Sequence, residues 1–279
     1  MDKTTLNVLV DNQAGFGCVA EHGFALWIEH GDQNILLDTG QGTALEGNAR
    51  TLGIDLSRTD ALVLSHGHYD HTGAVPLVLG AAPGSRVHCH PGVTEPRYSI
   101  SGGEARDIRM PLPSMRALGA LSAERLHWTG ESREIGAGVG LSGYIPRRSD
   151  FEDAGGPFYF DPHALRPDPV ADDQALWIRT DKGLIVCLGC CHAGLVNTLD
   201  YIREVAGETR IRAVIGGLHL GSAGKVRLEK TAQALREIKP DLMVLCHCTG
   251  ESATTYLRDH LDCPVHTGYS GLRLDASEF

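Results

Sequence analysis

The sequence predicts a layered α/β fold in which strands and helices share one large hydrophobic core. Short runs rich in valine, isoleucine and leucine recur along the chain, bounded by glycine, aspartate or proline, as is typical of buried strands. Segments with apolar residues at three- and four-residue spacing lie between some of these runs, as in amphipathic helices. Of the 279 residues, 42% are hydrophobic and 22% are charged, so a core can form without disulfides or structural metals.

Nine apolar runs are predicted as strands and two amphipathic segments as helices. The strands are Leu6–Val10, Phe24–Glu29, Asn34–Leu37, Ala61–Leu64, Arg86–His90, Ala175–Thr180, Gly183–Leu188, Ala213–Ile215 and Leu242–Leu245. The helices are Asn197–Ala206 and Leu228–Ile238. The second helix is expected to end before Pro240, because proline lacks the N–H that a helix interior needs. Strands and helices mixed in this way predict helical layers packed on sheets.

The stretch from about 101 to 173 differs from the rest of the chain. It is rich in glycine, proline, arginine and aspartate, and its strand signals are weak and scattered. We therefore predict a single domain over residues 1–279, with this stretch as a lid-like or substrate-side insert. The alternative is that the stretch is only a structural connection.

The formal net charge of −10 argues against a broad binding surface for nucleic acid or an anionic membrane. A small-molecule substrate is expected instead, and a local basic pocket for an anionic one is compatible with this charge. The N-terminus lacks a basic segment followed by an apolar one, and no apolar run reaches the ~18 residues of a membrane span. We therefore expect a cytoplasmic protein with its eight cysteines reduced.

A cluster of metal-binding side chains follows the apolar run Ala61–Leu64 directly. It reads Ser65-His66-Gly67-His68-Tyr69-Asp70-His71. One residue separates His66 from His68, so in extended or turn backbone both imidazoles can reach one cation. Asp70 and His71 come next, where a turn can direct them to a second cation about 3.5–4 Å away. Neutral imidazole and carboxylate are ligands that suit zinc, manganese or iron.

This motif resembles the H-x-H-x-D-H signature of the metallo-β-lactamase superfamily. The resemblance implies a four-layer αβ/βα sandwich with one or two metal ions at its edge. Asn34–Gly40 resembles the superfamily's early strand, which implies that Asp38 orients a metal ligand. The chain more closely resembles the branch of 7,8-dihydropterin-6-methyl-4-(β-D-ribofuranosyl)aminobenzene 5′-phosphate synthase-like proteins. The resembling segments are Val10–Asn12, Ala20–Phe24, Leu64–Gly73, Gly189–Gly194, Ile215–Leu220 and His247–Gly250.

The same resemblance assigns two further histidines to the metals. His192 follows the strand Leu184–Leu188 and corresponds to the third histidine of the first site. His247 follows the strand Leu242–Leu245 and corresponds to the final motif histidine, which completes the second site. The alternative for each is a histidine at the edge of the core, hydrogen-bonded to the backbone. The expected cofactor is one or two divalent ions, with zinc favoured and manganese or iron as alternatives.

The superfamily usually has an aspartate that bridges both metals in a strand-end Gly-Asp turn, and this sequence has none there. Cys190 and His219 are the two candidates for that position. The Cys190 thiol could bridge once a metal had deprotonated it. His219 could ligate a metal, although we favour substrate contact or catalysis for it.

Three other residues are candidates for contact with the substrate. His22 stands in a Glu-His-Gly turn before a strand, and the resemblance makes it a candidate for lining the pocket. Arg147 could clamp an anionic group together with Arg148, because guanidinium suits phosphate and carboxylate. The alternatives are a structural role for His22 and an exposed, solvated arginine pair.

Two further clusters of histidine and cysteine are interpreted as structural. His88 and His90 flank a cysteine on one strand and share a face, but the stronger motif already accounts for the metal. His247 lies between Cys246 and Cys248. The two-residue period of extended backbone predicts that both cysteines point away from it.

Together these residues predict a hydrolase that attacks its substrate with metal-bound hydroxide. Asp70 would ligate the second metal or manage the proton. The family resemblance implies a small substrate that is phosphorylated or pterin-like. The alternatives are an iron-dependent oxidoreductase of the persulfide dioxygenase type, and a metal-binding protein without turnover.

Overall fold

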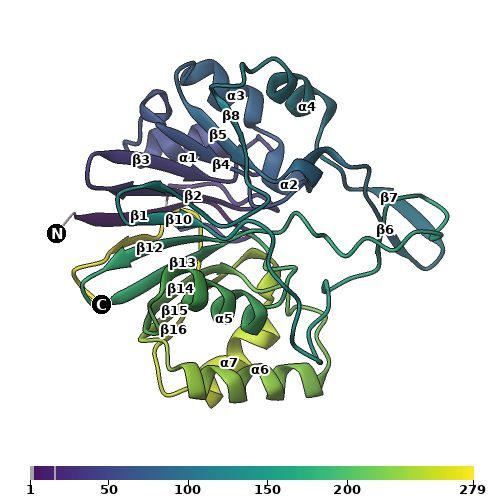
Figure 1. Ribbon diagram of the computed structural model, residues 1–279, viewed down its shortest axis with the longest axis vertical. Helices are drawn as coiled ribbons and strands as arrows, with labels where there is room; N and C mark the ends of the chain where they lie inside the picture. The colour runs from purple at the N-terminus through teal and green to yellow at the C-terminus, as the bar shows by residue number, and fades with distance from the viewer. Residues whose placement is uncertain (1–2, 16) are drawn as a thin grey trace.

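Two mixed seven-stranded sheets pack face to face in the computed structural model, which describes residues 3–15 and 17–279 (Figure 1). The strands of the first sheet are β1 (Thr4–Val10), β2 (Ala25–His30), β3 (Gln33–Leu37), β4 (Ala61–Val63), β5 (Arg86–Cys89), β8 (Leu126–Trp128) and β17 (Arg273–Asp275). Those of the second are β9 (Arg133–Gly136), β10 (Val139–Leu141), β12 (Leu176–Thr180), β13 (Gly183–Leu188), β14 (Ile211–Gly217), β15 (Leu242–Cys246) and β16 (Val265–Thr267). Their orders are β17-β1-β2-β3-β4-β5-β8 and β16-β15-β14-β13-β12-β10-β9.

Helices cover the outer face of each sheet (Figure 1). The first sheet carries α1 (Leu45–Thr51), α3 (Val75–Ala81) and α4 (Leu112–Gly119). The second carries α5 (Leu195–Ala206), α6 (Lys225–Ile238) and α7 (Glu251–His260). The short elements are α2 (Tyr69–Thr72), η1 (Leu56–Arg58), η2 (Pro91–Thr94) and η3 (His247–Thr249). No helix among the residues that the structure describes is long and apolar enough to cross a membrane.

Three hydrophobic clusters hold these layers together. One lies between the sheets and includes Ile35 and Ile185. A second packs the first sheet against its helices through residues such as Leu45, and a third packs the second sheet against its helices through residues such as Leu199. Three apolar interfaces separate four layers, so the expected four-layer αβ/βα sandwich is confirmed.

Strand β13 shows why the predicted strands read as continuous apolar runs. Ile185 and Cys187 face the cluster between the sheets, whereas Leu184, Val186 and Leu188 face the helical layer. Both faces of the strand are therefore buried, and no polar alternation is left in its sequence.

All nine predicted strands and both predicted helices are present, with ends that differ by at most three residues. Helix α6 ends at Ile238, followed by Lys239 in a left-handed conformation and then by Pro240. The short helices and the edge strands were not predicted, because few residues carry their periodicity.

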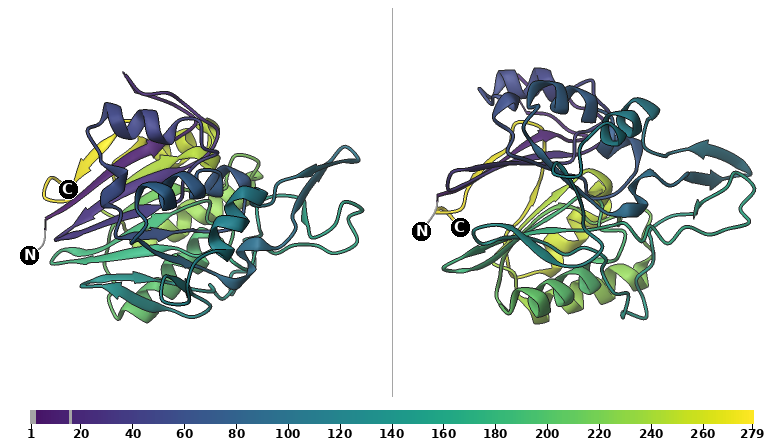
Figure 2. Two further views of the ribbon diagram at one scale, coloured as in Figure 1. Left: turned by 90° about the horizontal axis from the view of Figure 1, so that it is seen from above. Right: turned by 45° about the horizontal axis from the view of Figure 1, so that its top comes forward.

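The stretch of about 101–173 contributes to the core as well as to a projecting part. Strand β8 pairs with β5, and β10 pairs with β12, so the middle of the stretch belongs to the two sheets. A separate sheet of β6 (Tyr98–Ser101), β7 (Glu104–Asp107) and β11 (Phe158–Tyr159) projects from the body in every view (Figures 1 and 2). The projecting part thus comes from two segments, about 98–107 and 156–168, rather than from the whole predicted insert, because residues 148–153 contact α5 and α6.

A buried ion cluster fixes the root of this projecting sheet. The Arg97 guanidinium lies 2.5 Å and 2.8 Å from the two carboxylate oxygens of Asp172, and 2.9 Å from Asp168. All three side chains are buried. Asp172 also accepts a hydrogen bond of 2.8 Å from the backbone N–H of Gly67, within the histidine motif. One carboxylate therefore joins the projecting sheet to the predicted metal loop.

Replacement of Arg97 should destabilise the protein strongly. Arg97→Met leaves two buried carboxylates without their cation, so we expect the free energy of unfolding to fall by about 3–5 kcal/mol. Arg109→Met removes an exposed pair with Asp107, which is 2.7 Å long, and should cost less than about 1 kcal/mol. Denaturant unfolding of both variants measures the difference, and equal losses would contradict a structural role for the buried cluster.

Candidate metal centre

The predicted metal-binding residues lie at one edge of the sandwich, just beyond the ends of strands. His66 and His68 follow β4, Cys190 and His192 follow β13, and His247 follows β15. Strands β3 and β4 are parallel, as are β13, β14 and β15. The carboxyl ends of parallel strands open at the same edge of a sheet, which brings these loops together.

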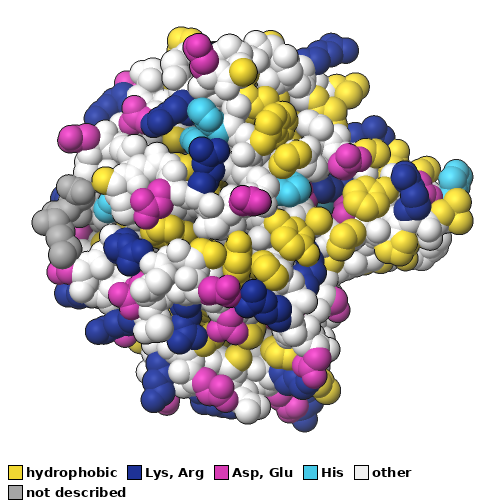
Figure 3. Space-filling view, viewed as in Figure 1, with side chains coloured by type: hydrophobic (Ala, Val, Ile, Leu, Met, Phe, Trp, Pro, Cys, Tyr) yellow, Lys and Arg dark blue, Asp and Glu magenta, His cyan; other side chains and the backbone are white. Residues whose placement is uncertain are grey.

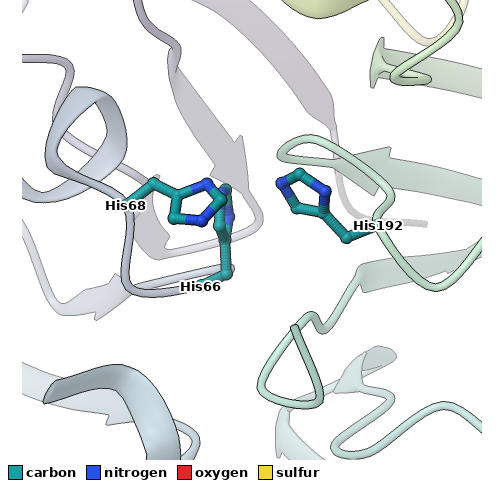
Figure 4. Close-up of side chains that lie close together, drawn as sticks. All are labelled: His66, His68 and His192. Atoms are coloured by element: carbon teal, nitrogen blue, oxygen red, sulfur yellow. The ribbon is translucent and has the colours of Figure 1, made fainter. Parts of the chain in front are cut away.

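Three buried histidines converge from two facing loops (Figure 4). Nε2 of His66 lies 2.9 Å from Nδ1 of His68, and one nitrogen from each of His66, His68 and His192 lies within 4.8 Å of the others. Burial and neighbouring imidazoles lower the pKa of all three histidines well below the usual range, and the charge of Arg97 adds to this for His66 and His68. They are therefore neutral, which is the form that binds a metal.

Hydrogen bonds behind the rings decide which nitrogen faces the centre. The Ser65 hydroxyl donates to Asp38 Oδ2 at 2.6 Å, so it accepts the Nδ1–H of His66 at 2.9 Å. Nδ1 of His192 donates to the carbonyl of Ala154 at 2.7 Å. Nε2 of His192 is then buried with no hydrogen-bond partner among the described residues. A buried nitrogen lone pair without a partner costs free energy, and a bound metal ion would remove that cost. The three imidazoles therefore fit a metal site.

A second group of ligands lies beside the first. His71 donates its Nδ1–H to Asp38 at 2.7 Å, and its Nε2 is 3.0 Å from Cys190 Sγ. His247 donates its Nδ1–H to Asn12 Oδ1 at 2.8 Å, and its Nε2 is 3.4 Å from Asp70 Oδ2. The outer nitrogen of each ring is again held by the protein, and the inner one faces other ligand atoms.

Asp38 stands behind both groups. It is fully buried and accepts hydrogen bonds from the Ser65 backbone N–H, the Ser65 hydroxyl and His71. Burial lowers the pKa of His71, but the charge and hydrogen bond of Asp38 outweigh that effect and raise it to about 9. These contacts give Asp38 the orienting position that the resemblance implied.

Asp70 and His22 form the side of the centre that faces the pocket. His22 Nε2 lies 3.1 Å from Asp70 Oδ2, and more than half of the His22 side chain is exposed. Burial raises the pKa of Asp70, but hydrogen bonds from His22 and His247 more than offset this and hold it well below the usual range. Asp70 is therefore a carboxylate, available to a metal or to a proton.

The structure separates the roles of two other predicted residues. His219 packs against His192 with ring centres 4.4 Å apart, but it belongs to none of the groups of described residues that could hold an ion. Burial lowers the pKa of His219 to about 4, so its ring is neutral. Arg147 does not reach the pocket, because its guanidinium donates to the carbonyls of His192, Pro169 and Val170. It braces the His192 loop instead, while the neighbouring Arg148 pairs with Glu204 on the surface.

The predicted direction of Cys248 is wrong. Cys246 does point into the core between the sheets, but Cys248 Sγ lies within 4.8 Å of ligand atoms of His247 and Cys190. The reason is local backbone geometry, because residues 247–249 form the turn η3 and His247 has a φ of +49°. The alternation of side chains between the two faces of strand β15 therefore ends at Cys246.

The histidines near β5 have structural contacts. His88 stacks on His127 with ring centres 4.9 Å apart, and Nδ1 of His90 accepts a hydrogen bond from Gly92 at the start of η2. Neither belongs to a metal-ligating group of the described residues.

Asp172, Asp173 and Gln174 were not predicted from the sequence, and they bind the backbone of both loops that carry the three histidines. Asp172 accepts from the N–H of Gly67, and Asp173 accepts from the N–H of Ala193 at 2.8 Å. The backbone N–H of Gln174 donates to the carbonyl of Ser65 at 3.0 Å. In the sequence these residues form a polar Asp-Asp-Gln run directly before a strand, and polar residues are common at strand ends whether or not a metal loop lies nearby.

A pocket of about 280 Å³ opens over the centre, at the root of the projecting sheet. Its wall includes Tyr69, Arg106 and Phe158. The space-filling view shows histidine at the junction of the body and the projecting part, with hydrophobic side chains gathered on the latter (Figure 3). A larger cavity of about 680 Å³ lies elsewhere, beside Lys3 and Arg212, and contains none of the metal-ligating groups.

Known proteins are similar to this chain in sequence and in fold. The family model of the metallo-beta-lactamase superfamily matches residues 19–200. The chain is 26% identical to the 7,8-dihydropterin-6-methyl-4-(beta-D-ribofuranosyl)-aminobenzene-5′-phosphate synthase of Methanocaldococcus jannaschii, over 91% of this chain and 90% of that protein. It is 29% identical to an uncharacterised protein of the same organism, over 90% and 93% of the two chains. Among solved structures, Tm1679, described as a metal-dependent hydrolase of the beta-lactamase superfamily, has a TM-score of 0.81 and 30% identity, covering 97% and 98% of the chains.

Removal of the Asp38 charge should weaken metal binding. Asp38→Asn loses the acceptor that fixes the protonated nitrogens of His66 and His71, so we expect metal affinity to fall roughly 10–100-fold. Competition with a chelating dye measures the affinity, and the exposed Asp32→Asn is the control. Unchanged affinity in Asp38→Asn would contradict the orienting role.

Proposed function

Because the chain belongs to the metallo-β-lactamase superfamily, we propose that it is a metal-dependent hydrolase of a small anionic substrate. One observation carries this proposal: His66, His71, His192 and His247 each have one ring nitrogen held by the protein and the other turned to a shared buried centre. One or two divalent ions, with zinc the favoured choice, would supply a hydroxide nucleophile at neutral pH and polarise the bond under attack. The described similarity to a metal-dependent hydrolase supports the reaction class.

The residues around the centre suit metal binding and charge stabilisation. Asp70 is ionised and lies between His22 and His247, so its carboxylate would ligate a metal ion or orient a water by accepting a hydrogen bond from it. His219 is neutral and lines the pocket, with its Nδ1 buried against Gly155. An N–H on its other ring nitrogen, Nε2, would hydrogen-bond a substrate oxygen on which charge develops.

The pocket wall favours a substrate with an anionic group and a flat ring. Arg106 is exposed, donates to the Tyr69 hydroxyl at 2.7 Å and stands 5.1 Å from the centre of that ring. It takes part in none of the ion pairs among the described residues, so its charge is free for a phosphate or carboxylate. Phe158 adds a second aromatic surface. A phosphorylated or pterin-like compound has both features, as the name of the archaeal relative suggests.

Hydrolysis can be tested with a panel of phosphodiesters, phosphomonoesters and lactones, each with zinc, manganese or iron. We expect metal-dependent turnover that falls at least about a hundredfold in His192→Ala, because the first group loses a ligand. The exposed His163→Ala is the control and should keep its turnover. Full turnover in His192→Ala would exclude the proposal, and oxygen consumption by an iron centre without hydrolysis would favour the oxidoreductase alternative.

Arg106 should determine the affinity for the anionic group. Arg106→Gln removes a charged donor and should raise KM for a phosphorylated substrate roughly tenfold to a hundredfold, with little change in kcat. Arg109→Gln is the matched control, because Arg109 is already paired with Asp107. Steady-state kinetics on both variants decides this, and an equal effect of the two substitutions would argue against a specific anion contact.

A further inference from the structure

Two thiols, those of Cys190 and Cys248, lie among the imidazoles of the centre. Cys190 Sγ is 3.0 Å from Nε2 of His71 and also lies close to the His66 ring. The same sulfur belongs to a second group, with His247 and Cys248, whose ligand atoms are all within 4.8 Å of one another. Cys190 is thus the one residue shared by a group containing His71 and a group containing His247.

We propose that Cys190 and Cys248 bind a metal as thiolates and, together with His71 and His247, form a soft second metal position beside the three-histidine one. This deepens the proposed function, since it assigns the ligands and the metal class of the same centre. Each Sγ–H loses its proton to solvent as the sulfur–metal bond forms, and no atom changes its oxidation state.

The spacing of three of the four side chains, Cys190, His247 and Cys248, suits one ion. Ligand atoms around a tetrahedral zinc, with bonds of roughly 2.0–2.3 Å, lie roughly 3.3–3.8 Å apart. The pairs in the Cys190, His247 and Cys248 group fall within 4.8 Å, so these three need only small movements. His71 is 3.0 Å from Cys190 but lies outside that group, so its ring must move toward the other two ligands. His71 and His247 already have their outer nitrogens hydrogen-bonded, which directs both inner nitrogens toward the sulfurs, and a metal bound there would displace any proton on the inner nitrogen of His71.

The surrounding backbone makes room for the second sulfur. Gly217 ends β14, and a Cβ at this position would lie 2.6 Å from Cys248 Sγ. Any larger residue there would displace the thiol from the centre. The turn η3 and the positive φ of His247 direct the Cys248 side chain to the same place.

Other buried cysteines lack these surroundings. Cys187 and Cys246 belong to the apolar cluster between the sheets, and Cys191 belongs to the cluster under the helices, where its sulfur is 3.5 Å from the Thr198 hydroxyl. Cys190 and Cys248 are instead surrounded by imidazoles and line the pocket. Their position therefore differs from that of cysteines that only fill a core.

A thiolate pair has a consequence for metal choice. Two thiolates balance the charge of a divalent ion, and sulfur ligands favour zinc, iron or cobalt over manganese or magnesium. The three-histidine position has no sulfur. The two positions should therefore differ in affinity and in metal preference.

Cobalt(II) tests the proposal directly, because sulfur bonded to cobalt gives intense charge-transfer absorption in the near ultraviolet. The purified protein, kept reduced and free of oxygen, is titrated with cobalt chloride. We expect this absorption to appear as the second position fills. It should fall in proportion to the thiolates removed in Cys190→Ser and Cys248→Ser, and vanish in the double variant. Cys191→Ser is the matched control, buried and adjacent, and should keep the full absorption. Cobalt binding without the absorption, or an unchanged spectrum in the double variant, would overturn the proposal.

A measurement on the unchanged protein does not depend on the folding of the variants. Cys248, Cys18 and Cys263 are all partly exposed and should react with iodoacetamide in the metal-free protein. Zinc should protect Cys248 alone, and equal reactivity with and without zinc would overturn the proposal. Hydrolysis is assayed on the same samples without alkylation. Hydrolysis without thiolate absorption rejects only the thiolate ligands, whereas thiolate absorption without hydrolysis rejects only the proposed hydrolase.

Discussion

The hydrogen bonds accepted by one buried carboxylate, Asp38, are the constraint on which the histidine-motif side of the centre depends. Asp38 receives the Nδ1–H of His71 directly and controls the Nδ1–H of His66 through the hydroxyl of Ser65. A buried charge is stable only when it is fully hydrogen-bonded, and three donors meet that need here. The fit is close, because a Cβ on Gly189 would lie 2.1 Å from the Ser65 hydroxyl and 2.8 Å from Asp38.

The sandwich supports a site that would be unstable in isolation. Seven non-glycine residues in the described part of the chain have positive φ, and four of them are at or next to the centre: Asp38, Cys191, His219 and His247. Such conformations cost roughly 1–3 kcal/mol each and persist where the surrounding structure imposes them. The closely packed apolar interfaces on both sides of each sheet provide that constraint, so rigid strands present strained loops.

Hydrogen bonds and ion pairs connect the projecting sheet, whose residues line the pocket, to the loops that carry the histidines. Arg97 and Asp172 tie the root of the projecting sheet to the backbone of Gly67, and Asp173 ties the same segment to the His192 loop. Arg106 and Phe158 stand on that projecting sheet and line the pocket. If Arg106 binds an anionic group as proposed, its binding energy would position the substrate against the centre without a change in the ligand loops.

Local patterns in the sequence were sufficient to predict the main strands, the layered α/β class and the histidine motif. The spacing of apolar residues, the strand lengths and the spacing of ligands are all properties of short segments. The proposal that Asp38 orients a ligand came from the resemblance to a family, and the structure adds its hydrogen bonds to Ser65 and His71. Contacts between distant segments decided the rest: Gly67 and Asp172 are 105 residues apart, and His247 meets Asn12 across 235. The direction of Cys248 and the bracing role of Arg147 depend on backbone turns and carbonyl positions that exist only after the sheets have packed. Local sequence patterns therefore identified candidate ligands, and only the packing of distant segments determined which of their side chains lie close together.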